Sequence, residues 1–122
     1  KEAEDIRRWN ILHPESKPRK SFLEKMIKTA NGPVIAVSDY VKLVSEQIAP
    51  YINCPFVALG TDGFGRSDTR ENLRDFFEVN RYYIILYALD KLAKINQIDK
   101  NVISKCIKKY KIDFNKPNPN KV

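Results

Sequence analysis

Two short apolar segments on either side of a helix-like segment most strongly constrain how this chain can fold. The first, PVIAVSD at 33–39, and the second, PFVALG at 55–60, are bounded by turn residues and are typical of buried strands. Between them, DYVKLVSEQIAPYI at 39–52 repeats apolar residues at helical spacing. This order predicts an α/β fold with a βαβ unit, in which parallel strands near 33–38 and 55–60 are joined by a right-handed crossover.

Capping signals place several helices around this unit. Ser21 and Glu24 have the spacing of a capping box at the start of one helix. Further helices are predicted at 39–52, 68–79 and 99–112, with Asp39, Asp68 and Asp99 as their respective N-caps.

One more helix and two irregular ends complete the predicted organisation. The segment at 81–95 is apolar on nearly every side at its start, so we expect this helix to be largely buried. Residues 1–20 contain two prolines and predict a short helical start followed by an irregular connector. Residues 113–122 have no apolar period and predict an irregular surface tail.

The formal net charge of +7 raises the possibility of an acidic partner. The densest basic cluster lies in the predicted helix at 99–112, whose apolar residues recur at helical spacing, so we interpret its lysines as a solvated face and expect no nucleic-acid partner. The alternative is a small basic interaction module that binds acidic protein or nucleic acid through these residues: Lys105, Lys108, Lys109 and Lys111.

The cysteines and the single histidine show no spacing typical of a metal or catalytic site. Cys54 and Cys106 lie among apolar residues and are predicted to be buried free thiols, as in a protein of the reducing cytoplasm. His13 has no partner that would make a nucleophile or a ligand set, so we expect a structural or interface role. The longest apolar run, 82–89, is too short to span a bilayer, and no membrane partner is predicted.

A glycine-rich loop, ALGTDGFGRSDTREN at 58–72, joins the second predicted strand to the next helix. Such a position often binds anions, but its spacing fits neither the dinucleotide nor the phosphate-loop motif, and it lacks the alternating ligands of a calcium loop. We therefore favour an architectural loop over a ligand site. Its candidate residues are Asp62, Gly63, Phe64, Gly65, Arg66 and Asp68.

Each of these loop residues carries a specific expectation. Gly63 and Gly65 are expected to allow positive φ, and Phe64 to pack against its surroundings. Arg66 is expected to reach a carboxylate, in this domain or in a neighbouring one. Asp68 should cap the following helix by accepting the backbone N–H of Glu71.

The segment GTDGFGRSDTRENLRDFFEVNRYYI, at 60–84, closely resembles the carboxyl-terminal region of the homodimeric, bacterial-type pyruvate dehydrogenase family. Segments at 7–27, 32–52 and 98–113 resemble the same family in the same order. The resemblance implies an incomplete transketolase C-terminal-like domain spanning residues 1–122, truncated from a much larger thiamine-diphosphate-dependent enzyme. Such an incomplete sheet should leave a strand edge or an apolar face uncovered.

The resemblance also implies a function for the parent enzyme. Family members decarboxylate pyruvate with thiamine diphosphate and magnesium, act as homodimers in the bacterial cytoplasm, and pass the acetyl group to dihydrolipoyl acetyltransferase. The triplet Thr61-Asp62-Gly63 is similar to the start of the family's cofactor motif, but threonine replaces its first glycine. We therefore assign no catalytic, cofactor-binding or metal residue here and expect the isolated chain to be an inactive, dimer-supporting domain. A member acting on another 2-oxo acid stays open.

Overall fold

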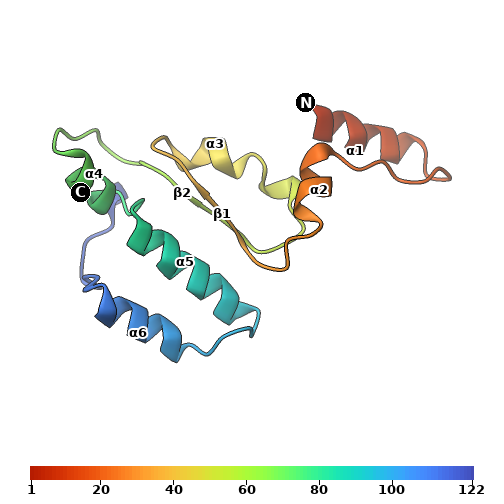
Figure 1. Cartoon of the computed structure of the whole chain (residues 1–122). Coiled ribbons are helices and arrows are strands. Elements are labelled where there is room, and N and C mark those ends of the chain that lie inside the picture. Colours follow the sequence, from red (N-terminus) through yellow and green to blue (C-terminus); the bar gives the residue numbers. More distant parts are fainter.

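A two-stranded parallel sheet lies at the centre of the computed structural model, which describes residues 1–122 (Figure 1). β1 (Val34–Val37) pairs with β2 (Phe56–Leu59), with Val34 opposite Phe56 and Val37 opposite Leu59. The predicted parallel βαβ unit is therefore confirmed. β-branched residues fill most of β1, because their stiff side chains pack well on a pleated surface.

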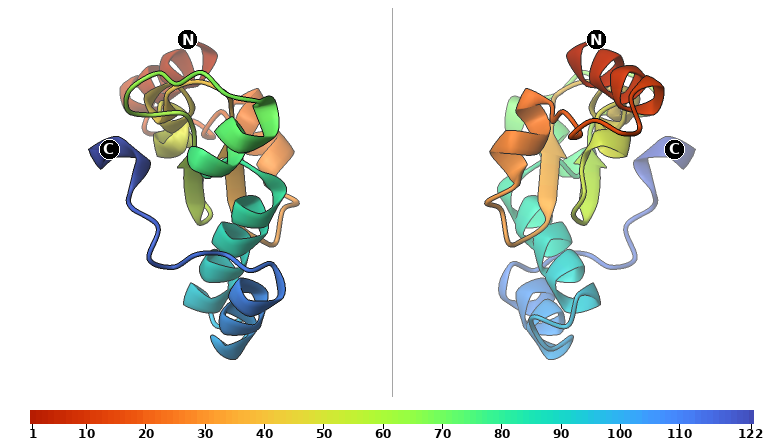
Figure 2. Two further views of the ribbon diagram at one scale, coloured as in Figure 1. Left: turned by 90° about the vertical axis from the view of Figure 1, so that its left-hand side faces the viewer. Right: turned by 90° about the vertical axis from the view of Figure 1, so that its right-hand side faces the viewer.

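Helices cover the two faces of this sheet in layers. The remaining elements are α1 (Glu2–Leu12), α2 (Phe22–Ile27), α3 (Lys42–Glu46), α4 (Arg70–Phe76), α5 (Arg81–Lys94), α6 (Asn101–Lys109) and the 3-10 turns η1 (Ala49–Tyr51) and η2 (Pro119–Lys121). In Figure 1, α3 lies on one side of the strands and α5 on the other, and α6 runs beside α5 as an outer layer. Figure 2 shows α1 at one end of the molecule and the α5–α6 pair at the other.

The crossover helix α3 is shorter than predicted and begins differently. Val41 occupies its N-cap position and offers no side-chain cap, so the prediction of Asp39 as the N-cap was wrong. The N–H of Lys42 instead donates to Asp62 Oδ1 at 2.9 Å, from the loop after β2. The helix ends at Glu46, and Pro50 lies in η1 rather than in a continuing α-helix.

Side-chain caps fix most of the other helix starts. At α2 the predicted capping box is confirmed, with Glu24 N–H donating to Ser21 Oγ at 3.2 Å and Ser21 N–H to Glu24 Oε2 at 2.7 Å. Asn80 caps α5, a role that sequence analysis missed. At α6 the N-cap position is Lys100, which offers no side-chain cap, so the prediction of Asp99 as the N-cap was wrong by one residue; Asp99 still accepts the N–H of Asn101 at 2.7 Å.

Three helices end in the same way, with a left-handed residue just beyond the last turn. These residues are Glu78 after α4 (φ 61°), Asn96 after α5 (φ 57°) and Lys111 after α6 (φ 53°). At α6 the N–H groups of Lys111 and Ile112 donate to the carbonyls of Lys108 and Ile107, respectively. This pair of hydrogen bonds defines a Schellman motif, and the ends of α4 and α5 have the same pair. None of the three positions holds glycine, the residue usually found there.

The hydrophobic core is small for a chain of this length. Its buried apolar residues are Ile52, Ala58, Leu59, Val79, Tyr83, Ala93 and Cys106. Only Tyr83 and Ala93 are buried on α5, so the expectation that this helix is largely buried is wrong in this chain. Many large apolar side chains on α1, α2 and α3 are exposed instead, which agrees with the expectation of an uncovered apolar face.

The amino-terminal 20 residues are more ordered than a simple connector. Residues 2–12 form α1, which packs beside α2, and the carboxylate of Glu2 accepts the N–H of Phe22 at 3.2 Å. Asn10 and Arg19 exchange two hydrogen bonds across the turn that follows, at 2.8 and 3.0 Å. The predicted helical start is therefore confirmed, while the irregular part is limited to the segment between α1 and α2.

Candidate functional site

The glycine-rich loop borders a hollow of about 490 Å³ beside α4. The loop supplies one wall, α4 supplies a second, and Asp39 lies at the end of β1 nearby. Apolar contacts come from Leu73, Phe77 and Val79. The hollow therefore combines an apolar floor with a charged rim.

The first residues of the loop are held by the segment between β1 and α3. Thr61 N–H donates to the carbonyl of Tyr40 at 2.9 Å, and Asp62 receives the N–H of Lys42, with the ammonium of Lys42 at 3.8 Å. A Cβ at Gly60 would lie 2.4 Å from the Tyr40 carbonyl oxygen, so only glycine permits this approach. This part of the loop ties the ends of the two strands to the start of α3.

The two central glycines behave differently from each other. Gly63 has φ 97°, as predicted, and a Cβ there would lie 2.9 Å from the carbonyl oxygen of Pro119. Gly65 does not have positive φ and has open space around it, so the expectation for Gly65 was wrong. Phe64 between them is 81% exposed, which contradicts its predicted packing in this chain.

The polar end of the loop also differs from its predicted contacts. The guanidinium of Arg66 lies over the ring of Phe76, 4.0 Å from its centroid, and pairs with no carboxylate of this chain. Thr69, not Asp68, is the N-cap of α4, and its hydroxyl accepts the N–H of Asn72 at 3.3 Å. The predicted bond from Glu71 to Asp68 is absent.

Asp68 nonetheless accepts two hydrogen bonds next to this cap. Its Oδ1 accepts the side-chain amide of Asn72 at 2.8 Å and the N–H of Thr69. These hydrogen bonds lower the pKa of Asp68, the bond from Asn72 contributing most. Asp68 therefore stays ionised at neutral pH and orients the first turn of α4.

The rim of the hollow is predominantly basic. Arg66, Arg70 and Arg74 line it together with Asp39 and Asp68. Arg74 is paired with Asp39 at 3.0 Å, and Arg70 forms no ion pair within the chain. The arrangement can accept an anionic group of a neighbouring surface, but it contains no nucleophile with an adjacent base.

The residues of this site do not fit a metal or a metal-held cofactor. The Asp62 carboxylate is already engaged by Lys42, and no group of three or more His, Cys, Asp or Glu side chains in the chain could hold a metal ion. The likeness of Thr61-Asp62-Gly63 to a cofactor motif therefore has no supporting geometry. None of the helices combines the length and the apolar character that a bilayer span requires.

The remaining sequence-predicted residues lie away from the hollow. Cys54 and Cys106 are free thiols, as predicted; the predicted burial is confirmed for Cys106, whereas Cys54 is only half-buried. His13 is exposed at the end of α1, where its ring stacks on Trp9 with 4.3 Å between centroids. Its Nδ1 lies 2.8 Å from the Trp9 carbonyl oxygen, a local structural contact.

One residue near the site, Lys116 of the predicted irregular tail, was not expected from the sequence. Its ammonium donates to the carbonyls of Asp75 and Phe76 at the end of α4. Only 16% of its side chain is exposed. The surrounding sequence NKPNPN predicts no such anchor, since a lysine between asparagine and proline is usually solvated.

Comparisons with known proteins converge on one family. Residues 6–80 match the family model described as the transketolase-like TK C-terminal domain. The chain is 53% identical over 119 residues to the pyruvate dehydrogenase E1 component of Cupriavidus necator, 49% over 118 residues to that of Buchnera aphidicola and 45% over 120 residues to that of Escherichia coli. These matches cover 98%, 96% and 98% of this chain, which spans 13% of the length of each relative.

Proposed function

This chain belongs to the transketolase-like C-terminal domain family, and we propose that it is the structural, dimer-supporting carboxyl-terminal part of an acetyl-transferring pyruvate dehydrogenase component. The observation that carries the proposal is identity of 45–53% across nearly the whole chain to proteins of that name. The 13% share of each relative makes the chain a part of such an enzyme rather than its equivalent. On this reading residues 1–122 form one truncated domain.

The chemistry belongs to the parent enzyme. It would decarboxylate pyruvate on thiamine diphosphate held with magnesium, and the bound cofactor supplies the electron sink for the carbanion formed as carbon dioxide leaves. The acetyl group would pass to the lipoyl group of dihydrolipoyl acetyltransferase, in the bacterial cytoplasm. The residues of this chain contribute no donor set for that cofactor, so we assign them support of the remaining domains and of the second subunit.

The contacts of the glycine-rich loop support the architectural assignment. Its first residues connect β2 to the start of α3, and Gly63 touches the tail. Its remaining residues are exposed in this chain, including Phe64 and the basic rim of the hollow. An exposed aromatic flanked by arginines is a common composition for a surface that another domain or subunit covers.

Calorimetric titration tests whether the cofactor site lies outside this chain. Thiamine diphosphate with magnesium is titrated into the 122-residue chain and into the complete polypeptide encoded by its reading frame. We expect saturable binding, and release of carbon dioxide from pyruvate, only with the complete polypeptide. Saturable binding by the chain alone would show that it contains a cofactor site.

A substitution in the loop tests its role separately. In the complete polypeptide, Asp68→Ala is expected to reduce thermal stability or dimer affinity, because the start of α4 loses two hydrogen bonds. Turnover per folded dimer should change little. A stable, dimeric variant with a large loss of turnover would place the loop in the catalytic cycle instead.

A further inference from the structure

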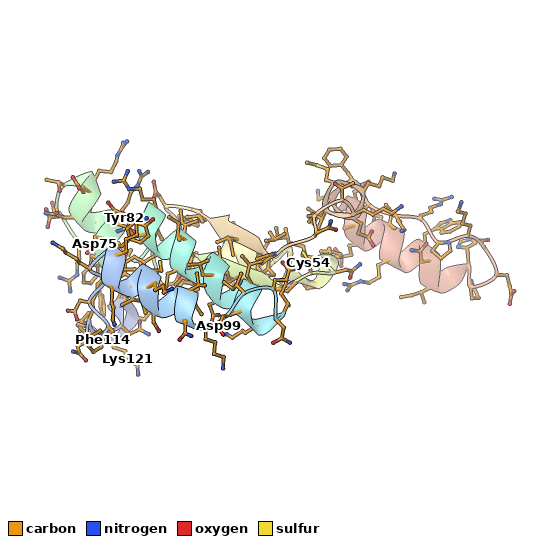
Figure 3. The ribbon with its side chains drawn as sticks, turned by 60° about the horizontal axis from the view of Figure 1, so that its bottom comes forward. Cys54, Asp75, Tyr82, Asp99, Phe114 and Lys121 are labelled. Atoms are coloured by element: carbon orange, nitrogen blue, oxygen red, sulfur yellow. The ribbon has the colours of Figure 1, made fainter.

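The carboxyl-terminal tail returns from α6 to the region where the glycine-rich loop enters α4. Residues 113–118 have no helix or strand, and η2 follows at Pro119–Lys121. In Figure 3 the tail residues Phe114 and Lys121 lie at the same end of the molecule as Asp75 of α4. A tail without regular structure keeps such a position only if specific contacts hold it.

Lys116 makes the first of these contacts, at the carboxyl end of α4. Its ammonium donates to the carbonyl of Phe76 at 3.0 Å and to that of Asp75, and lies 3.8 Å from the Glu78 carboxylate. It also lies 5.0 Å from the centre of the Tyr83 ring. A cation placed on carbonyls at the carboxyl end of a helix complements the negative end of the helix dipole.

Pro119 makes the second contact, at the opposite end of the same segment. Pro119 is buried, and its carbonyl oxygen lies 2.9 Å from the position that a Cβ on Gly63 would take. Asn118 holds the turn in place by accepting the N–H of Asn120 at 2.9 Å. The tail therefore contacts the segment 60–79 in two places, before α4 and at the carboxyl end of α4. The helix between these contacts has only seven residues.

We propose that the tail, residues 113–122, is a strap that keeps the glycine-rich loop and α4 in place beyond the carboxyl ends of the two strands. Apart from the hydrogen bonds of Thr61 and Asp62 at its start and the ion pair between Arg74 and Asp39, the segment 60–79 has little support of its own. Among its residues only Val79 and the first residue, Gly60, are buried, and a helix of two turns is marginal in isolation. The strap supplies the missing contacts, so release of the tail frees the loop and α4 together while leaving β1 and β2 paired.

Hydrogen exchange measured by mass spectrometry on the complete polypeptide tests this proposal. Lys116→Met removes the ammonium and keeps a side chain of similar length. We expect exchange of the backbone amides in 60–79 to accelerate about tenfold or more, because two charge-assisted hydrogen bonds are lost. Peptides that cover β1 and β2 should exchange as in the wild type.

Lys121→Met is the matched control. It removes the same charge from the same tail, but the Lys121 side chain forms no hydrogen bond or ion pair, so exchange in 60–79 should not change. Equal exchange in the two variants would overturn the proposal. So would acceleration of the same size in β1 and β2, since that pattern means general destabilisation.

A milder variant covers the case in which Lys116→Met does not fold. Asn118→Ala leaves Lys116 intact and removes only the acceptor that holds the turn at Pro119. It should accelerate exchange in residues 60–66, next to Gly63, more than in 70–79. Unchanged exchange in 60–66 would contradict the contact between the tail and the loop.

Discussion

At the scale of single residues, Asp62 shows how a helix can be capped from a distant part of the chain. Its carboxylate accepts the first N–H of α3 from a loop 20 residues away. Asp62→Ala should reduce stability by about 1 kcal/mol, because this N–H loses its partner. Asp62→Asn keeps an acceptor and is the control. Thermal unfolding checks both variants, and equal losses would mean that the negative charge, rather than the hydrogen bond, is what matters.

Gly63 and Gly65 offer a second residue-scale prediction with its control two positions away. Gly63→Ala should cost about 1–3 kcal/mol, because alanine disfavours positive φ and its Cβ would meet the Pro119 carbonyl. Gly65→Ala should change stability by less than about 0.5 kcal/mol, since that site is open. Thermal unfolding of the two variants distinguishes them. Similar losses at both positions would contradict positive φ at Gly63 and open space at Gly65.

At the scale of elements, the helix ends contain unfavourable residues that can be replaced. Lys111 is left-handed in the Schellman motif after α6, where glycine is unstrained. Lys111→Gly should stabilise the chain by about 0.5–1 kcal/mol, and Lys111→Ala, which keeps the strain, should not. Asn96→Gly should give a smaller gain, because asparagine tolerates this conformation. Chemical denaturation measures the differences. A loss on Lys111→Gly would mean that flexibility of the unfolded chain outweighs the strain.

The same elements show what the sequence could predict and what it could not. Both strands and the Ser21 cap were predictable, because their signals lie within a few adjacent residues. The cap of α3 was not, since Asp39 has the right local position and Asp62 makes the bond from another segment. In the loop, Thr69 and Asp68 are both good N-cap residues, so the sequence does not distinguish them. The ends of α4, α5 and α6 were not predictable to the residue either, because none has the glycine that usually marks the end of a helix.

At the scale of the whole molecule, this chain exposes more apolar surface than an independent domain usually does. Leu43 on α3 is 66% exposed, and Phe22 and Met26 on α2 and Ile11 on α1 are similarly open. These positions explain why burial was the least predictable feature: helical periodicity identifies an apolar face but not the surface that covers it. We expect the isolated chain to self-associate, which sedimentation would detect.

Leu43→Lys should act in opposite directions in the two contexts. In the isolated chain it should reduce association, because it places a charge on the exposed face of α3. In the complete polypeptide it should reduce stability by roughly 2 kcal/mol or more, because the face is then covered and the charge buried. Sedimentation and thermal unfolding measure the two effects. An unchanged complete polypeptide would show that α3 is exposed in the full protein as well.

The alkylation rates of the two free thiols can report motions of the outer helix, α6. Cys106 is buried on α6, and burial raises the pKa of its thiol, so an alkylating reagent can reach a reactive thiolate there only after α6 moves away. Cys54 is half-buried and reacts without that movement. The ratio of the two alkylation rates therefore reports how often the outer layer opens, with no label added to the protein.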